Sequence, residues 1–120
     1  MNNPFQMIGG NNVEEQDKSQ DLNSRIKGLI NSAPIFLFMK GTAQAPQCGF
    51  SANVARILDS YNVAYNTFNI LSDMEIREGV KSFSNWPTYP QLYIKGQLVG
   101  GSDIVMELHQ SGELKELLKQ

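Results

Sequence analysis

The chain has 120 residues, 41% of them hydrophobic, and a formal net charge of −2 at pH 7. This length suits one domain with a single core, and so mild a charge, with no basic run, argues against a nucleic-acid partner. One cysteine, Cys48, and one histidine, His109, exclude an intramolecular disulfide and a zinc site made of cysteine and histidine.

A chain without disulfides suits a reducing compartment. We therefore expect a cytoplasmic protein, or a mitochondrial-matrix protein whose transit peptide has been removed. The longest apolar runs, such as Ile35–Met39, are too short to cross a bilayer, so we expect no membrane association. Residues 1–20 are rich in Asn and Gln without an apolar period, which predicts a flexible tail before a domain over residues 21–120.

The domain is predicted to start with a helix that Asp21 caps. Four apolar residues share one face of this helix: Leu22, Ile26, Leu29 and Ile30. Pro34 ends it, and the short apolar run Ile35–Met39 is typical of a strand covered on both faces. A polar loop from Gly41 to Gln47 then leads to Cys48.

Helices and strands continue to alternate after the cysteine. A second helix is predicted over Phe50–Tyr61 and a strand over Tyr65–Ile70, from their apolar spacing. Ser72 or Asp73 is expected to cap a third helix that ends near Asn85.

The last third of the domain starts at Trp86-Pro87-Thr88-Tyr89-Pro90, where two prolines exclude regular structure. Gln91–Ile94 and Gln97–Val99 predict a hairpin, and a final helix is expected with Ser102 or Asp103 as its cap. The resulting order α-β-α-β-α-β-β-α predicts an α/β fold. Its four-stranded mixed β-sheet would have a parallel first part and helices on both faces.

Cys48 opens the helix that follows the first strand. The unpaired N–H groups of a first helical turn favour negative charge, and such a position lowers a cysteine pKa below its free value of ~8.5. Lys40, at the end of the preceding strand, adds positive charge if the loop folds back. The alternative is an unreactive cysteine that serves as a small apolar side chain.

Four motifs lie in order on the predicted elements: Met39-Lys40-Gly41, Cys48-Gly49-Phe50-Ser51, Trp86-Pro87-Thr88-Tyr89-Pro90-Gln91 and Gly100-Gly101-Ser102-Asp103. Together, over about Asp21 to Lys119, they resemble the monothiol, CGFS-type glutaredoxins of the thioredoxin-like superfamily. The resemblance implies glutathione binding, a glutathione-ligated 2Fe–2S cluster shared by two subunits, and a role in iron–sulfur delivery.

The resemblance also implies a glutathione site. Lys40 and Arg77 are candidates for the carboxylate at the glycine end, and the backbone of Tyr89, joined to a cis Pro90, for the cysteinyl part. The helix start at Ser102 and the Asp103 carboxylate would hold the γ-glutamyl end. Solvated surface charges, an ordinary turn and plain helix capping are the alternatives. Trp86 is expected to pack, and Phe50 is a candidate interface residue.

Two serines decide what chemistry is open to Cys48. Ser51 stands where dithiol oxidoreductases carry their second cysteine, so no internal disulfide can form there. Ser102 replaces a cysteine found in many family members and removes another disulfide partner. A 2Fe–2S cluster needs four ligands, usually thiolates. If a cluster is present, ligand counting predicts a homodimer bridged by it, with two glutathiones.

The leading hypothesis is an iron–sulfur carrier with Cys48 as ligand, whose partners are scaffold and recipient iron–sulfur proteins and, by resemblance, BolA-like proteins. The alternative is a glutathione-dependent oxidoreductase in which the Cys48 thiolate attacks mixed disulfides and glutathione resolves them. The length of the loop from Gly41 to Gln47 favours the carrier, because dithiol glutaredoxins have a shorter approach to their cysteine. An interaction module with an inert cysteine is a third hypothesis.

Overall fold

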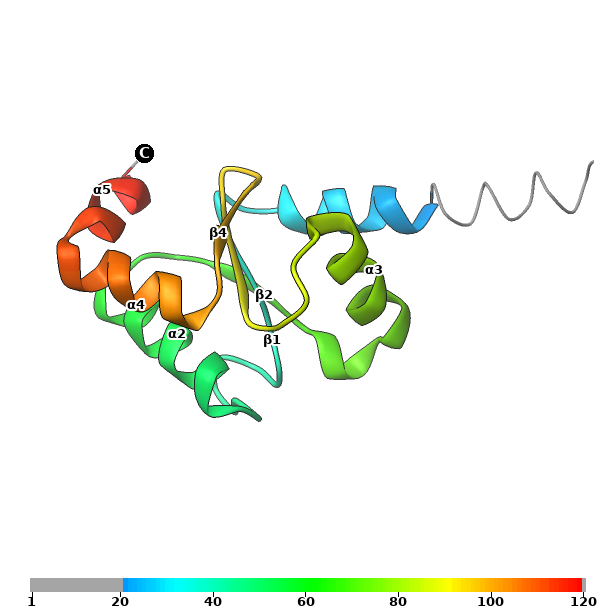
Figure 1. Ribbon diagram of the computed structural model, residues 1–120, viewed down its shortest axis with the longest axis horizontal. Coiled ribbons are helices and arrows are strands. Elements are labelled where there is room, and N and C mark those ends of the chain that lie inside the picture. Colours follow the sequence, from blue (N-terminus) through cyan, green and yellow to red (C-terminus); the bar gives the residue numbers. More distant parts are fainter. Residues whose placement is uncertain (1–20, 120) are drawn as a thin grey trace, which may run out of the picture.

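The computed structural model describes residues 21–119 (Figure 1). Residues 21–30 are helical. The elements that follow are β1 (Ile35–Met39), α2 (Gly49–Ser60), β2 (Asn66–Asn69), a 3-10 helix (Ile70–Ser72), α3 (Met74–Ser84), β3 (Gln91–Ile94), β4 (Gln97–Gly100), α4 (Ser102–Ser111) and α5 (Glu113–Lys119). The predicted tail, residues 1–20, lies outside the described residues. Within residues 21–119, no helix combines the length and the apolar character that a bilayer crossing needs.

The four strands form one mixed sheet in the order β2-β1-β3-β4. β1 and β2 are parallel, whereas β3 is antiparallel to both β1 and β4. This is the four-stranded α/β arrangement that the element order predicts, and it is thioredoxin-like.

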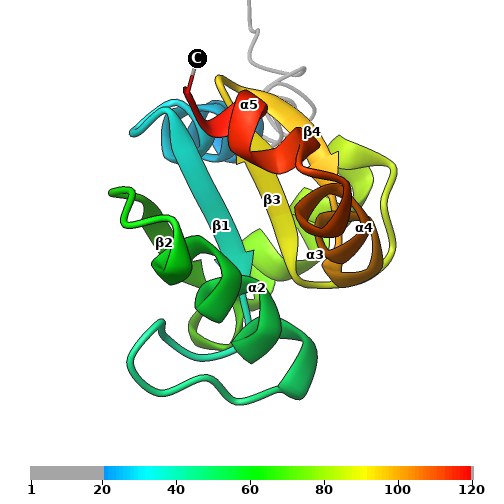
Figure 2. The same cartoon turned by 90° about the vertical axis from the view of Figure 1, so that its left-hand side faces the viewer.

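Helices cover both faces of the sheet, as Figure 2 shows. Alternate residues of β1 point to opposite faces. Ile35, Leu37 and Met39 pack with α2, α4 and α5, whereas Phe36 and Phe38 pack with α3 and the helix over residues 21–30. All five residues of β1 are buried, which explains why the sequence of this strand is apolar throughout.

Some predicted boundaries and caps differ from the structure. Asp73, rather than Ser72, caps α3 by accepting the Ile76 N–H at 3.1 Å. Asp21 has helical backbone and so does not cap its helix. The single final helix that the sequence predicts is two helices, α4 and α5, because Gly112 takes a φ of 86° at the end of α4.

The predicted cap of α4 is also wrong, because the helix begins at Ser102 with Gly101 as its N-cap. A Cβ atom at position 101 would lie 3.2 Å from the carbonyl oxygen of Pro90. The chain therefore approaches the turn before β3 closely at a glycine, and the helix starts directly after it. As a result, Ser102 and Asp103 lie in the first turn of α4 rather than before it.

Candidate functional site

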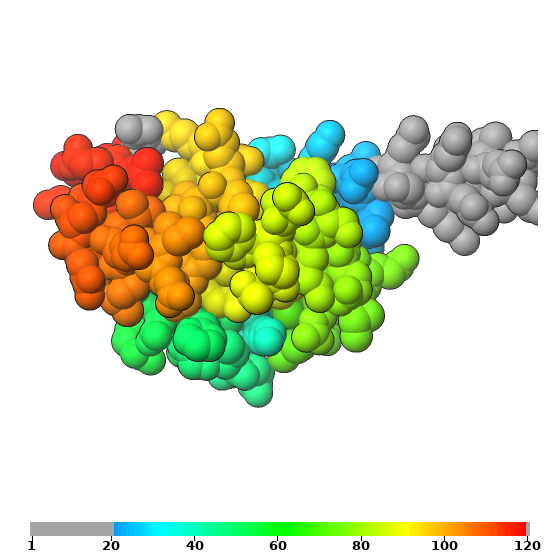
Figure 3. All heavy atoms as spheres, in the orientation of Figure 1, coloured from blue at the N-terminus to red at the C-terminus, as the bar shows by residue number. Residues whose placement is uncertain are grey.

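A pocket of about 380 Å³ lies where the start of α2, one side of α3, the turn before β3 and the start of α4 meet. Figure 3 shows these segments, far apart in the sequence, meeting on one face. All six residues that the sequence nominates line this pocket: Lys40, Cys48, Arg77, Tyr89, Ser102 and Asp103.

Cys48 is the N-cap residue of α2, with an extended backbone, and its side chain is half-buried. The backbone N–H of Ser51 is the largest of the influences that lower the Cys48 pKa. The Phe50 N–H, the Lys40 ammonium and the Ser51 hydroxyl act in the same direction, and burial opposes them. The thiolate is therefore stabilised by the helix start, as the sequence predicts.

The loop between β1 and α2 folds back on itself. The Gln47 N–H donates to the Lys40 carbonyl at 2.9 Å, and Gly41 pairs with Pro46 in an isolated bridge. Gly41 has a φ of 88°, and a Cβ atom there would lie 2.6 Å from both the Ala45 oxygen and the Gln47 nitrogen, so only glycine fits. This closure brings Lys40 close enough to lower the pKa of Cys48.

Ser51 is fully buried. Its hydroxyl oxygen accepts a hydrogen bond from the Lys40 N–H at 3.0 Å. The position of a second cysteine is thus taken by a hydroxyl that joins α2 to the end of β1.

The turn before β3 forms one wall of the pocket, and the peptide bond between Tyr89 and Pro90 is cis, as the resemblance implies. Gln91 has no exposed surface. Its amide nitrogen donates to the carbonyls of Trp86, at 3.1 Å, and Thr88, at 3.2 Å, and its oxygen accepts from the Tyr93 hydroxyl at 3.0 Å. The sequence motif contains Gln91, but its role as the anchor of this wall is visible only in the structure.

The Tyr89 side chain is buried, and its hydroxyl donates to the Arg77 carbonyl at 2.7 Å. Burial raises the pKa of this phenol, so the side chain is neutral and acts as a link between the turn and α3. Its backbone is the part of Tyr89 left to contact a ligand.

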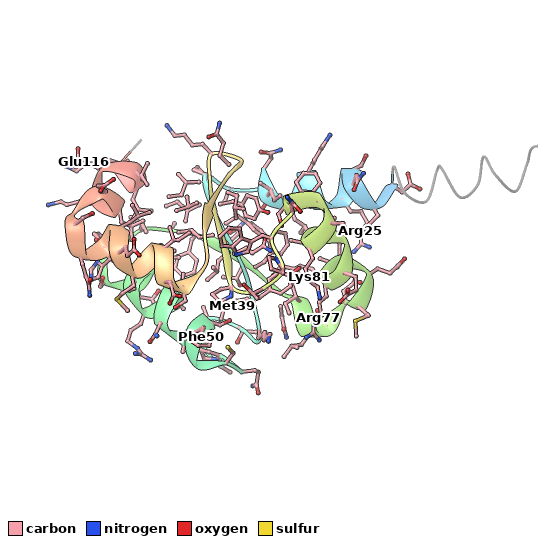
Figure 4. The ribbon with its side chains drawn as sticks, in the orientation of Figure 1. Arg25, Met39, Phe50, Arg77, Lys81 and Glu116 are labelled. Carbon is pink, nitrogen blue, oxygen red and sulfur yellow. The ribbon has the colours of Figure 1, made fainter. Side chains whose placement is uncertain are left out.

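Two cationic side chains of α3 line the pocket. Arg77 and Lys81 are four residues apart, which places them on the same face of a helix, and Figure 4 shows them opposite Phe50 of α2, across the end of β1. Lys81 also forms an ion pair of 3.0 Å with Glu78. Sequence reasoning did not single out Lys81; its spacing from Arg77 is the signal that identifies it.

The opposite side of the pocket is the start of α4. Among the described residues, no side chain caps this helix, so its first-turn N–H groups are available to an anion. Ser102 is half-buried and Asp103 is exposed there. Trp86 was expected only to pack, but it also lines the pocket. Phe50, beside Cys48, is 60% exposed.

No three His, Cys, Asp or Glu side chains gather as a metal site within residues 21–119. The sequence has one cysteine. One chain therefore offers a single thiolate, at the mouth of a pocket with cations on one side and a helix start on the other.

Comparisons with known proteins agree on one family. The glutaredoxin family model matches residues 35–99. A zebrafish (Danio rerio) protein named glutaredoxin 3 is 56% identical over 89% of this chain and 33% of its own length. A monothiol glutaredoxin, ycf64-like, of the cyanobacterium Synechocystis sp. is 51% identical over 80% of this chain and 90% of its own length. The chain spans only 21% to 33% of the length of three curated relatives, the zebrafish protein among them.

A crystal structure of a buckwheat glutaredoxin–glutathione complex superposes with a TM-score of 0.76. It is 25% identical in sequence, and the match covers 86% of this chain and 92% of the buckwheat chain.

Proposed function

Because the chain belongs to the glutaredoxin family, we propose that the pocket beside Cys48 binds glutathione and that this monothiol glutaredoxin carries a 2Fe–2S cluster. The observation that carries the proposal is the position of Cys48. Its half-buried thiol, with a lowered pKa, lies at a pocket whose two sides match the charges of glutathione.

Glutathione carries two carboxylates and one ammonium. Lys40 and Arg77, with Lys81 beside them, are suited to the carboxylate of the glycine end. The first turn of α4 is suited to the γ-glutamyl carboxylate, and the Asp103 carboxylate to the ammonium. The buckwheat relative forms a complex with glutathione, which supports glutathione as the ligand of this pocket.

The cluster is the cargo rather than a resident cofactor in this proposal. Four thiolates are the usual ligand set of a 2Fe–2S cluster, and each chain supplies one, from Cys48. Two chains and two bound glutathiones complete the set, so the cluster-loaded protein is a homodimer. Because glutathione exchanges freely, each subunit surrenders only one protein ligand when the cluster leaves.

The partners follow from this role. We propose transfer from scaffold proteins to recipient iron–sulfur proteins, and association with BolA-like proteins. A cytoplasmic location, or a mitochondrial matrix location, fits a protein that depends on glutathione and a reduced cysteine.

The lowered pKa of Cys48 also favours a second function, a glutathione-dependent oxidoreductase. The Cys48 thiolate would attack the glutathione sulfur of a mixed disulfide, and the substrate would leave as a thiolate. The thiolate of a second glutathione would then attack the Cys48–glutathione disulfide, so that oxidised glutathione forms and the Cys48 thiolate is regenerated. Ser51 cannot replace this second glutathione, because its hydroxyl forms no disulfide.

Anaerobic reconstitution with iron, sulfide and glutathione tests the carrier function. The native chain should become brown, with thiolate-to-iron absorption, and Cys48→Ser should remain a colourless, folded monomer. Native chain reconstituted without glutathione is the matched control and should also stay colourless. A Cys48→Ser protein that holds the cluster would contradict the ligand assignment. Cluster donation to an apo-ferredoxin, compared with turnover of a small glutathione mixed disulfide, separates the two functions.

A further inference from the structure

Three consecutive backbone groups at the end of β1 are each held by a different segment. The Lys40 N–H donates to the Ser51 hydroxyl of α2 at 3.0 Å. The Lys40 carbonyl accepts from the Gln47 N–H of the loop at 2.9 Å. The Gly41 N–H donates to the side-chain oxygen of Asn69, in β2, at 2.9 Å. The backbone that carries the Lys40 side chain is therefore fixed from three directions.

The Asn69 side chain adds one hydrogen bond between β1 and β2 beyond the last paired residues of the two strands. In the register of β1 and β2, Met39 is opposite Asn69, and the ladder ends there. The side chain of Asn69, rather than its backbone, then binds Gly41. The same oxygen accepts the Leu71 N–H at 3.0 Å. An amide oxygen has two acceptor sites, so both are in use and the Asn69 side chain is held in one orientation.

Asn69 is not among the described residues that line the pocket. Its hydrogen bond to the Gly41 N–H connects it to the pocket through Lys40, the residue before Gly41. Gly41 is a glycine with a positive φ, the residue with the most conformational freedom in the loop. Without the Asn69 hydrogen bond, the end of β1 loses one of its three restraints, and the flexible four-carbon stem of Lys40 gains freedom with it.

We propose that Asn69 is a positioning residue of this site. By holding the Gly41 N–H, it sets where the Lys40 ammonium lies relative to the Cys48 sulfur and to the glutathione carboxylate. The effect on glutathione binding rests on the proposed function, because it needs a bound glutathione carboxylate. The effect on the Cys48 sulfur does not need glutathione, because Lys40 and Cys48 line the same pocket and the hydrogen bonds above fix the backbone of Lys40.

Four variants test this inference: Asn69→Ala, Lys40→Ala, the double variant, and Asn66→Ala as a matched control. Asn66 is in the same strand, and its side-chain amide donates to Ser32 at 3.2 Å, away from Gly41. The first measurement is the pH midpoint of iodoacetamide alkylation, which reports on Cys48, the one thiol of the chain. The second is glutathione affinity, measured by calorimetry.

Asn69→Ala should raise the alkylation midpoint in the same direction as Lys40→Ala. It should also weaken glutathione binding about three- to tenfold, the range expected when one hydrogen bond is lost. In the Lys40→Ala background, Asn69→Ala should change the glutathione affinity less than about twofold and should leave the alkylation midpoint where Lys40→Ala alone places it, because its effect passes through Lys40. Asn66→Ala should match the native chain in both.

Two results would overturn the inference. One is a native midpoint and native affinity in Asn69→Ala while Lys40→Ala alters both. The other is full additivity in the double variant, which would show that Asn69 acts independently of Lys40. If Asn69→Ala does not fold, Asn69→Gln replaces it, because its longer side chain keeps the amide but displaces the oxygen. If the native chain binds no glutathione, the proposed function fails and the alkylation measurement still decides the role of Asn69.

Discussion

The charged form of the Cys48 thiol is stabilised by groups of its neighbouring residues. The backbone N–H groups of Ser51 and Phe50, in the first turn of α2, lower the pKa of this thiol, and the Lys40 ammonium, at the end of β1, acts in the same direction. These groups are in place only when the loop is closed and the helix is formed. The unfolded chain lacks them, so the Cys48 pKa differs between the two states.

This difference predicts a pH-dependent contribution of Cys48 to stability. The folded pKa is lowered, whereas the unfolded value is about 8.5. The thiolate therefore stabilises the fold fully above the unfolded pKa, and this stabilisation is lost as the pH falls through the folded pKa. Urea unfolding of the native chain and Cys48→Ser should show a difference in unfolding free energy that grows in favour of the native chain as the pH rises. A difference that is constant with pH would contradict the lowered pKa.

The residues that the sequence nominated differ from those that it missed in how they act on the pocket. Cys48 and Lys40 carry reactive or charged groups within recognisable motifs, and Arg77 carries a charge at a position that the resemblance matches, so composition and resemblance identify them. Asn69 acts through a hydrogen bond to Gly41, a residue that only the fold brings close, and Gln91 acts through hydrogen bonds within a turn whose conformation the sequence does not predict. Neutral polar residues of this kind have no distinctive pattern in a single sequence.

At the scale of elements, the pocket is bordered mainly by the ends of helices and strands, and by one side of α3. One border, the turn from Trp86 to Pro90, has no regular structure of its own and depends on Gln91. This glutamine is buried at the start of β3 and uses both ends of its amide. A buried amide with all its partners holds a loop firmly, because each broken bond would leave a polar group unpaired.

Gln91→Leu should therefore destabilise both the fold and the pocket. The change preserves volume but leaves the Tyr93 hydroxyl and two backbone carbonyls without this partner. We expect a loss of about 1–3 kcal/mol in the free energy of unfolding, together with weaker glutathione binding. Urea unfolding and calorimetry measure the two effects. Gln97→Leu, at an exposed position of β4, is the control and should change stability by less than about 0.5 kcal/mol. Equal losses in the two variants would contradict the role of Gln91.

Most elements follow from local patterns, because apolar spacing reports which face of each element is buried. The start of α4 does not. Its position depends on the close approach of Gly101 to the Pro90 carbonyl, a contact between two segments, and local capping preferences therefore pointed to the wrong residues. The sequence did not predict the 3-10 helix after β2 either. Asn69 is both the last residue of that strand and the N-cap of the 3-10 helix.

At the scale of the whole molecule, helices cover both faces of the sheet, and the pocket with Cys48 lies at one end of it. β1 has all its residues buried, and the chain becomes polar only where this strand ends and the loop to Cys48 begins. Phe50 exposes 60% of its surface beside that cysteine. An exposed aromatic ring next to a single thiolate is suited to contact with a second copy of the chain.

In the proposed carrier function, ligand counting makes the cluster-bridged assembly depend on glutathione. With one cysteine per chain, two chains, one cluster and two glutathiones form a closed set of four thiolates. Native mass spectrometry of the reconstituted protein should give this composition as one species. Removal of glutathione should cause loss of the cluster and return of the monomer together, because no ligand of the chain can replace the missing thiolates. A cluster-loaded dimer without glutathione, or a dimer that persists after the cluster is lost, would show that another contact holds the two chains.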